Sequence, residues 1–225
     1  TLLLSMYGLL ISFPVPIILA LLLNEIRVKW FKRVTQTLLY LPHFLSWVVI
    51  GATAYAMFAT NSGVINTLIA NAGKSPIPFL QEDAWWLFSY ILIGIWQTMG
   101  WGTIIYLAAI TNVNSELYEA AKVDGANRWQ QCLHVTLPCI RSTIVVMLIM
   151  QLGKLMGGSF ERIVALSNAK ATEYTTTIPV LVFKWFQGNK FSESTALGLF
   201  QSVIGVILVV ASDKIAKKLG EDGLL

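Results

Sequence analysis

Charged side chains are scarce in this chain. Only 12% of its 225 residues are Asp, Glu, Lys or Arg, whereas 56% are hydrophobic and the mean hydropathy is +0.66. An ordinary soluble domain is about a quarter charged. The deficit excludes a soluble domain of normal composition and indicates an all-α integral membrane protein.

Cysteine, histidine and catalytic motifs are also few or missing. The two cysteines, Cys132 and Cys139, lie at the cytoplasmic end of the topology predicted below, where thiols stay reduced, and we expect a structural role for both. No phosphate loop of the form G-x-x-x-x-G-K-[ST], nucleophile elbow or H-E-x-x-H motif occurs. The sequence therefore predicts no catalytic residue, no metal site and no nucleotide hydrolysis by this chain.

Long apolar segments are abundant. A membrane-spanning helix needs roughly 20 mainly apolar residues. Five segments qualify, at about 1–24, 36–60, 84–112, 138–158 and 194–212. The sequence thus predicts five visible transmembrane helices, with residues 1–212 forming a membrane domain and 213–225 a cytoplasmic tail.

The basic residues predict the orientation of these helices. They follow the first span (Arg27, Lys29, Lys32, Arg33) and the last span (Lys214, Lys217, Lys218). Because cytoplasmic loops carry an excess of Lys and Arg, both regions are placed inside, 113–137 is also cytoplasmic, and 61–83 and 159–193 are external. This clustering at span ends argues against a nucleic-acid partner. Five spans that end inside must begin outside, so we expect one more span before Thr1.

Polar residues within the spans are candidates for a substrate pathway. Trp96 and Gln97 lie among glycines of the third span, and Gln151 and Lys154 lie in the fourth. A lysine deep in a span costs about 2.5–3.5 kcal/mol on insertion scales and normally faces a partner or a wet cavity. If Lys154 lies near the outer end, however, it can snorkel to the interface or form a structural pair.

Two other segments have open interpretations. Pro14 and Pro16 in the first span predict a kink or break, which serves packing or forms a hinge. Residues 159–193 are too long and too apolar for a plain turn, and predict either a re-entrant helix that lines a pathway or an interfacial anchor.

The cytoplasmic segment 113–137 contains the most informative motif. Asn114 or Ser115 is expected to cap a helix that ends near Gly125, and a second short helix is expected from Asn127 until just before Pro138. Ala120 and Ala121 leave a shallow surface that a groove in another protein can approach closely. A DNA-binding helix-turn-helix is disfavoured because the segment has no core of its own, and a plain interfacial helix does not explain the spacing of the motif.

This motif resembles the signature of permease subunits of type I binding-protein-dependent ABC importers. The family pattern is Glu-Ala-Ala, three residues, Gly, then about a dozen residues to Leu-Pro. The matching residues are Glu119, Ala120, Ala121, Asp124, Gly125, Ala126, Leu137 and Pro138. Cys132, Ser142 and Trp129 depart from the residues common at their positions, which affects the packing of the second short helix. The run from Tyr7 to Glu25 is similar to the branch that imports carbohydrates.

The resemblance implies a bacterial inner-membrane permease that is not itself an enzyme. It further implies a second, different permease, two ATPase subunits that bind ATP and Mg²⁺, and a solute-binding protein outside. The helix at about 115–125 would couple the ATPases to the spans. Acidic, uronate-type oligosaccharides would suit the basic residues expected on the outer side (Lys154, Arg162, Lys170, Lys184, Lys190). A neutral sugar, a non-sugar solute and a secondary transporter driven by an ion gradient remain alternatives.

Overall fold

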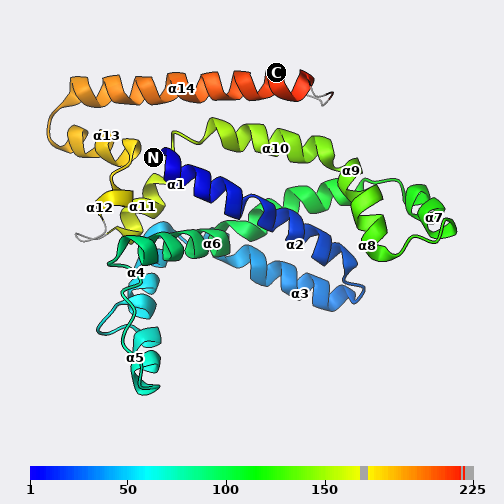
Figure 1. The fold of residues 1–225 in the computed structure, drawn as a ribbon, viewed down its shortest axis with the longest axis horizontal. Helices are drawn as coiled ribbons and strands as arrows, with labels where there is room; N and C mark the ends of the chain where they lie inside the picture. Colours follow the sequence, from blue (N-terminus) through cyan, green and yellow to red (C-terminus); the bar gives the residue numbers. More distant parts are fainter. Residues whose placement is uncertain (168–171, 219, 221–225) are drawn as a thin grey trace.

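The computed structural model describes residues 1–167, 172–218 and 220. Every regular element in these residues is a helix, which confirms the all-α fold. Most of the helices form an elongated bundle, and shorter helices project from its ends (Figure 1).

Three stretches are long and apolar enough to cross a membrane as continuous helices. The first joins α1 (Leu2–Tyr7), a π-helical turn (Gly8–Ser12) and α2 (Pro14–Glu25); the others are α6 (Asp83–Thr111) and α14 (Phe191–Lys218). The π-helical turn directly precedes Pro14 and Pro16. The disturbance predicted there is therefore a wider turn within a continuous span.

The other two predicted spans are bent pairs of helices. The first pair joins α3 (Lys29–Tyr40), with its 3₁₀ extension Leu41–Phe44, to α4 (Trp47–Phe58) at an angle of 102°. Leu45 and Ser46 are extended, and the Ser46 hydroxyl accepts a hydrogen bond from the Val49 N–H, so a new helix starts after the bend. The span predicted at 36–60 thus differs from one straight helix.

The second pair bends by 61° between Cys139 and Arg141. It contains α8 (Arg128–Gln131), a π-helical turn (Cys132–Thr136), α9 (Leu137–Cys139) and then α10 (Arg141–Gly153). Ile140 at the bend is fully buried. If each bent pair counts as one span, the structure has up to five spans by length and composition.

The expectation that the second short helix stops before Pro138 is wrong. Leu137 has helical angles (φ −61°, ψ −45°), and α9 passes through Pro138. The Leu137 N–H bonds to the Cys132 carbonyl in the π-helical turn. This wider turn accommodates the proline ring, and sequence rules for ordinary α-helices do not anticipate it.

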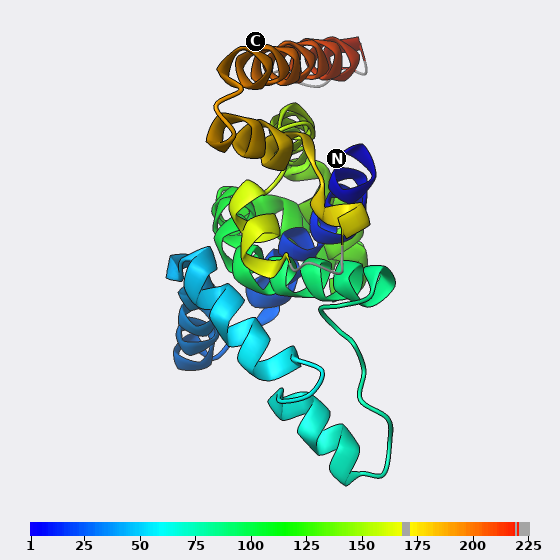
Figure 2. The same cartoon turned by 90° about the vertical axis from the view of Figure 1, so that its left-hand side faces the viewer.

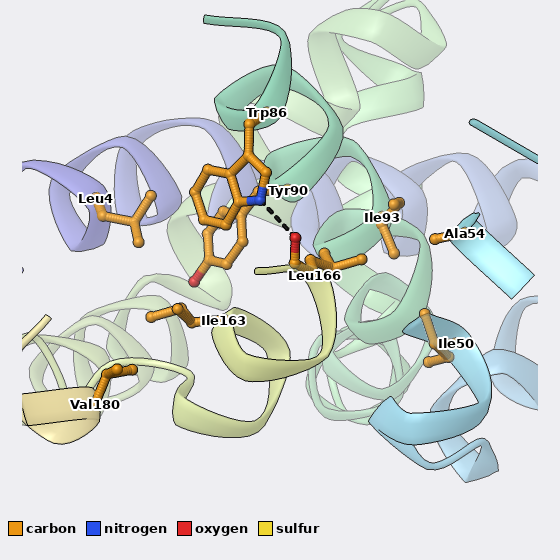
Figure 3. Close-up of a cluster of buried hydrophobic side chains, with 9 residues drawn as sticks. All are labelled: Leu4, Ile50, Ala54, Trp86, Tyr90, Ile93, Ile163, Leu166 and Val180. Atoms are coloured by element: carbon orange, nitrogen blue, oxygen red, sulfur yellow. Dashed lines mark hydrogen bonds between the residues drawn. The ribbon is translucent and has the colours of Figure 1, made fainter. Parts of the chain in front are cut away.

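Helix α6 runs through both hydrophobic cores. One core joins α1, α4 and α6 to α11 (Phe160–Leu166) and α13 (Ile178–Gln187), and Trp86 is fully buried in it (Figure 3). The other core packs α2 and the start of α10 around Tyr106 and Ile110. Between the cores, the ideal Cβ position at Gly100 is 2.0 Å from the Leu39 carbonyl oxygen, so only glycine fits there. Small residues in membrane spans allow helices to approach this closely.

The segments predicted to be external contain short helices. α5 (Val64–Asn71) and α4 extend away from the bundle (Figure 2). The buried Asn66 side chain holds the return loop, because its amide donates to the Ala59 and Ile77 carbonyls and accepts from the Ile77 N–H. The described residues between 159 and 190 contain three short helices, α11, α12 (Thr172–Thr175) and α13, and α14 begins at Phe191.

Helix α14 lies along the edge of the bundle and is largely uncovered (Figures 1 and 2). Its middle part exposes the large apolar side chains Leu199, Phe200, Val203, Val206 and Ile207. Such a surface suits contact with lipid or another membrane subunit. The helix continues past residue 212, where the membrane domain was expected to end, to Lys218.

Candidate functional site

The motif helix is α7 (Ser115–Val123), and a local cap fixes its start. The Asn114 side-chain oxygen accepts a hydrogen bond of 3.0 Å from the Glu116 N–H, and its amide group donates to the Glu116 carboxylate at 3.2 Å. Glu116 also lies in the first turn, where a negative charge favours the helix dipole. Of the two predicted caps, Asn114 is the one used.

A glycine turn ends α7. Gly125 has φ +80°, a left-handed conformation that glycine adopts at little cost. The Ala126 N–H bonds to the Ala121 carbonyl at 2.8 Å, and the Gly125 N–H bonds to the Lys122 carbonyl at 3.0 Å. These two bonds form a Schellman motif, so the signature glycine stands at the position where the backbone requires it.

A second cap begins the next helix almost at once. The Asn127 side chain accepts from the Gln130 N–H at 2.9 Å, and the Gln130 side chain accepts from the Asn127 N–H at 2.8 Å. This reciprocal capping box satisfies two backbone donors at the start of α8. In addition, the Gln131 side-chain amide donates to the Ala126 carbonyl at 2.8 Å. The connection between α7 and α8 is therefore held at both ends by hydrogen bonds.

The surface of α7 and its turn is small, apolar in part, and uncovered. Ala120, Asp124 and Gly125 are exposed, as is Glu119. Val123 is 88% exposed and Trp129 on α8 is 69% exposed. These two residues add apolar side chains to the surface, and α7 projects from the end of the molecule (Figure 1). The surface formed by residues 119–129 is called the α7–α8 surface below.

The α7–α8 surface is connected to the spans. An ion pair joins Arg128 at the start of α8 to Glu25 at the end of α2. The hydroxyls of Tyr118 on α7 and Thr136 are 3.0 Å apart. These two contacts join the surface to the first span and to the helices that lead into α10.

The motif residues do not all lie on one face. Ala121 and Ala126 are half-buried at the turn, and Leu137 packs against the second core. Pro138 is exposed but belongs to α9, beyond the π-helical turn. Leu137 thus anchors the segment, and Glu119, Ala120 and Gly125 form the accessible surface.

The predicted pathway residues occupy two separate helices. On α6, Trp96 is 43% exposed, whereas Gln97 is buried and its amide donates to the His43 carbonyl near the α3–α4 bend at 3.4 Å. Gln151 and Lys154 are exposed at the end of α10. In the described part of the chain, no hydrogen bond or ion pair joins the two pairs, so the structure does not assemble them into one site.

Among the outer basic residues, Arg162 has a distinctive environment that sequence reasoning did not single out. Its guanidinium donates to the Tyr90 hydroxyl at 2.7 Å and lies over the rings of Tyr90 and Trp47. Lys184 and Lys190 are exposed, and Lys170 lies outside the described residues. Residues 1–167, 172–218 and 220 contain no cluster of three His, Cys, Asp or Glu side chains that could hold a metal ion.

A hollow of about 360 Å³ opens between α11, α13 and α14. Its lining is mainly apolar and aromatic: Phe160, Pro179, Val182, Phe183, Phe186 and Ser194. It has no charged group, so it offers apolar contact without a polar anchor.

Residues 12–219 match the model of the family described as "Binding-protein-dependent transport system inner membrane component". The chain belongs to this family. It is therefore a multi-pass inner-membrane component of an ABC importer that works with other subunits, and it is a transport permease by family.

Curated relatives and solved structures are similar over nearly the whole chain. The polygalacturonan/rhamnogalacturonan transport system permease protein YteP of Bacillus subtilis (strain 168) is 46% identical over 225 residues, which cover 100% of this chain and 70% of the relative. Protein LplB of the same organism is 41% identical over 100% of this chain and 71% of its own length. A chain of a bacterial alginate ABC transporter, in complex with an alginate pentasaccharide-bound periplasmic protein, has a TM-score of 0.95 and 36% identity, and covers 99% of this chain and 78% of that chain.

Proposed function

We propose that this chain is one of two permease subunits in an ATP-driven importer of acidic oligosaccharides. The observation that carries the proposal is the rigid, uncovered α7–α8 surface in a transport permease that has no nucleotide-binding motif of its own. The chemistry of ATP is thereby assigned to partner subunits, which bind ATP with Mg²⁺ and close on each other.

In this proposal, α7 occupies a groove in one ATPase subunit. Ala120 and Ala121 allow close approach, Glu119 and Asp124 supply charge at one edge, and Gly125 with Ala126 forms the turn that fixes the angle to α8. Leu137 packs the segment against the second core, and Pro138 follows it in α9. Closure of the ATPase pair then moves α2 and α10 and switches the spans between inward-open and outward-open arrangements.

The partners follow from the family and from the uncovered surfaces. A second, different permease completes the pathway, and a solute-binding protein delivers the cargo from outside. The exposed apolar face of α14 is suited to the bilayer or to the second permease. We assign Trp96, Gln97, Gln151 and Lys154 to the pathway as a proposal, with Trp96 offering an aromatic face to a sugar ring and Gln97 supporting the helix bend.

The choice of cargo is supported by the relatives. The names of one relative and of the solved structure specify polygalacturonan/rhamnogalacturonan and alginate. Polygalacturonan and alginate are built from uronic acids, which carry one carboxylate on each sugar. The basic residues expected on the outer side of this chain suit such a cargo.

The test is uptake by the complete transporter in proteoliposomes. This chain, its partner permease, the ATPase subunits and the binding protein are reconstituted, and uptake of trigalacturonate and of maltotriose is measured with ATP inside or outside the vesicles as the orientation requires. We expect vanadate-sensitive uptake that depends on ATP and on the binding protein. Uptake driven by a proton or sodium gradient without ATP would show a secondary transporter, and uptake of neither sugar would exclude the carbohydrate assignment.

A further inference from the structure

The short helix α11 is locked into the first hydrophobic core. Its residues Ile163 and Leu166 are fully buried, and the Trp86 indole N–H donates to the Leu166 carbonyl at 2.7 Å (Figure 3). The Ala165 backbone also contacts α4, because the ideal Cβ position at Gly51 is 2.6 Å from the Ala165 carbonyl oxygen. Helix α11 therefore has a fixed position between α4 and α6, and the backbone of Arg162, which precedes Ile163, is fixed with it.

The guanidinium of Arg162 lies between the aromatic rings of Tyr90 and Trp47, beside Gly94, and this surrounding is called the Arg162 frame below. Its guanidinium carbon lies 3.9 Å from the centre of the Tyr90 ring and 5.7 Å from that of Trp47, and one nitrogen donates to the Tyr90 hydroxyl. Tyr90 is itself stacked on Trp86, with ring centres 5.0 Å apart. The ideal Cβ position at Gly94 is 1.7 Å from a guanidinium nitrogen of Arg162. Because glycine has no Cβ, the guanidinium can occupy this space.

The positive charge of Arg162 has no counter-charge in this frame. Among the side chains that the structure describes, in residues 1–167, 174–218 and 220, no carboxylate forms an ion pair with it, and its Nε is buried without a hydrogen-bond partner. The frame contacts α6, which is long and apolar enough to cross a membrane, at Gly94, about 16 Å along the helix from Asp83 at 1.5 Å per residue. Charged residues inside spans normally pair with one another or face a polar pathway.

The contacts present compensate the charge only in part. A cation over an aromatic ring gains about 0.5–2 kcal/mol, and the bond to Tyr90 is to a neutral group. A carboxylate is the partner whose geometry matches a guanidinium, because two parallel N–H groups can donate to its two oxygens. A uronic acid offers this carboxylate on a ring whose C–H face can also pack against Trp47.

We propose that Arg162, framed by Trp47, Tyr90 and Gly94, binds the carboxylates of an acidic oligosaccharide as it crosses this subunit. The inference rests on the proposed function and specifies its cargo-binding residue. Lys154 at the end of α10 is exposed and lacks such a frame, so Arg162 is the cation that discriminates acidic from neutral sugars.

The experiment compares Arg162→Gln, Arg162→Lys and the control Lys74→Gln, an exposed lysine in the 61–83 segment that is also predicted to be external, in the complete reconstituted transporter. Uptake of trigalacturonate and binding-protein-stimulated ATP hydrolysis are measured on the same preparations. We expect Arg162→Gln to lower trigalacturonate uptake at least roughly tenfold, the loss associated with one charged hydrogen bond, while ATP hydrolysis stays within about twofold. Arg162→Lys should recover part of the uptake lost in Arg162→Gln, and Lys74→Gln should leave uptake within about twofold of the wild type.

The outcomes separate a cargo contact from a structural clamp. Unchanged trigalacturonate uptake in Arg162→Gln, or a parallel loss of uptake and ATP hydrolysis, overturns the proposal. Tyr90→Phe removes the hydrogen bond but keeps the charge, so a loss as large as that of Arg162→Gln also overturns it. If the wild-type transporter carries maltotriose and not trigalacturonate, the carbohydrate importer stands and the role of Arg162 falls; if it carries neither, the proposed function itself fails.

Discussion

Replacing Gly125 by leucine tests whether the turn after α7 faces another protein. In this subunit no atom lies within 4 Å of the position that a Cβ at Gly125 would take, so the added side chain meets open space. The backbone is the source of strain, because φ is +80° and a left-handed conformation costs an L-residue about 1–2 kcal/mol. This strain is local to the turn that the two hydrogen bonds of the Schellman motif close.

Gly73 provides a matched control. It has φ +74°, and a Cβ there would also meet nothing within 4 Å. It follows α5 in the same type of turn, since the Lys74 N–H bonds to the Ile69 carbonyl and the Gly73 N–H bonds to the Ala70 carbonyl. Gly73→Leu therefore carries the same strain of about 1–2 kcal/mol in a segment predicted to be external.

The assay is ATP-dependent uptake by the complete transporter, with the amount of chain in the membrane and the retention of ATPase subunits measured alongside. We expect Gly125→Leu to insert normally, to lose ATPase subunits and to abolish uptake, whereas Gly73→Leu should retain the ATPase subunits and the uptake.

Gly125→Asn separates backbone strain from steric exclusion of the partner, because asparagine tolerates the left-handed region. It should keep more uptake than Gly125→Leu. If Gly125→Leu and Gly73→Leu show equal uptake and equal ATPase retention, the docking role of the turn is refuted.

Three further perturbations address the connections around this surface. Glu25→Arg and Arg128→Glu should each lower uptake a few-fold. The free energy of unfolding should change little, because a half-exposed ion pair contributes about 0–1 kcal/mol. The double variant, which exchanges the two charges, should restore uptake. Asn127→Ala removes the capping box and should destabilise the start of α8 by about 1 kcal/mol. Hydrogen exchange of the first backbone amides of α8 should become faster, and an unchanged exchange rate would contradict the role of this cap. Trp86→Phe leaves the Leu166 carbonyl without its indole donor, so thermal unfolding should show a loss of about 1–3 kcal/mol, whereas an unchanged midpoint would argue against this bond.

The helix at 115–123 could be predicted closely because its limits are local. Asn114 caps the first turn through its own neighbour, and Gly125 ends the helix through its backbone conformation. Such signals act over a few residues and need no tertiary contact. The same locality explains why the start of α8 at Asn127 was predicted correctly.

The bends and the arginine frame could not be predicted in this way. Hydropathy measures how apolar a stretch is and does not record direction, so the 102° bend after Phe44 was invisible in the run 36–60. The passage of α9 through Pro138 depends on a π-helical turn, which sequence rules for ordinary α-helices do not describe. Arg162 meets Tyr90 and Gly94 only because α11 packs on α6, which is a tertiary contact.

Site-specific cross-linking from α7 tests the central claim most directly. Val123, which is 88% exposed, is replaced by the photoreactive p-benzoylphenylalanine in the complete transporter, and Val64 on α5 is replaced in the same way as the control. We predict a cross-link from position 123 to an ATPase subunit and a yield that changes when ATP is bound, with no ATPase cross-link from position 64. A position-123 variant that is fully assembled and active in uptake but cross-links only to lipid or to the solute-binding protein would contradict the assignment of α7 as the coupling helix.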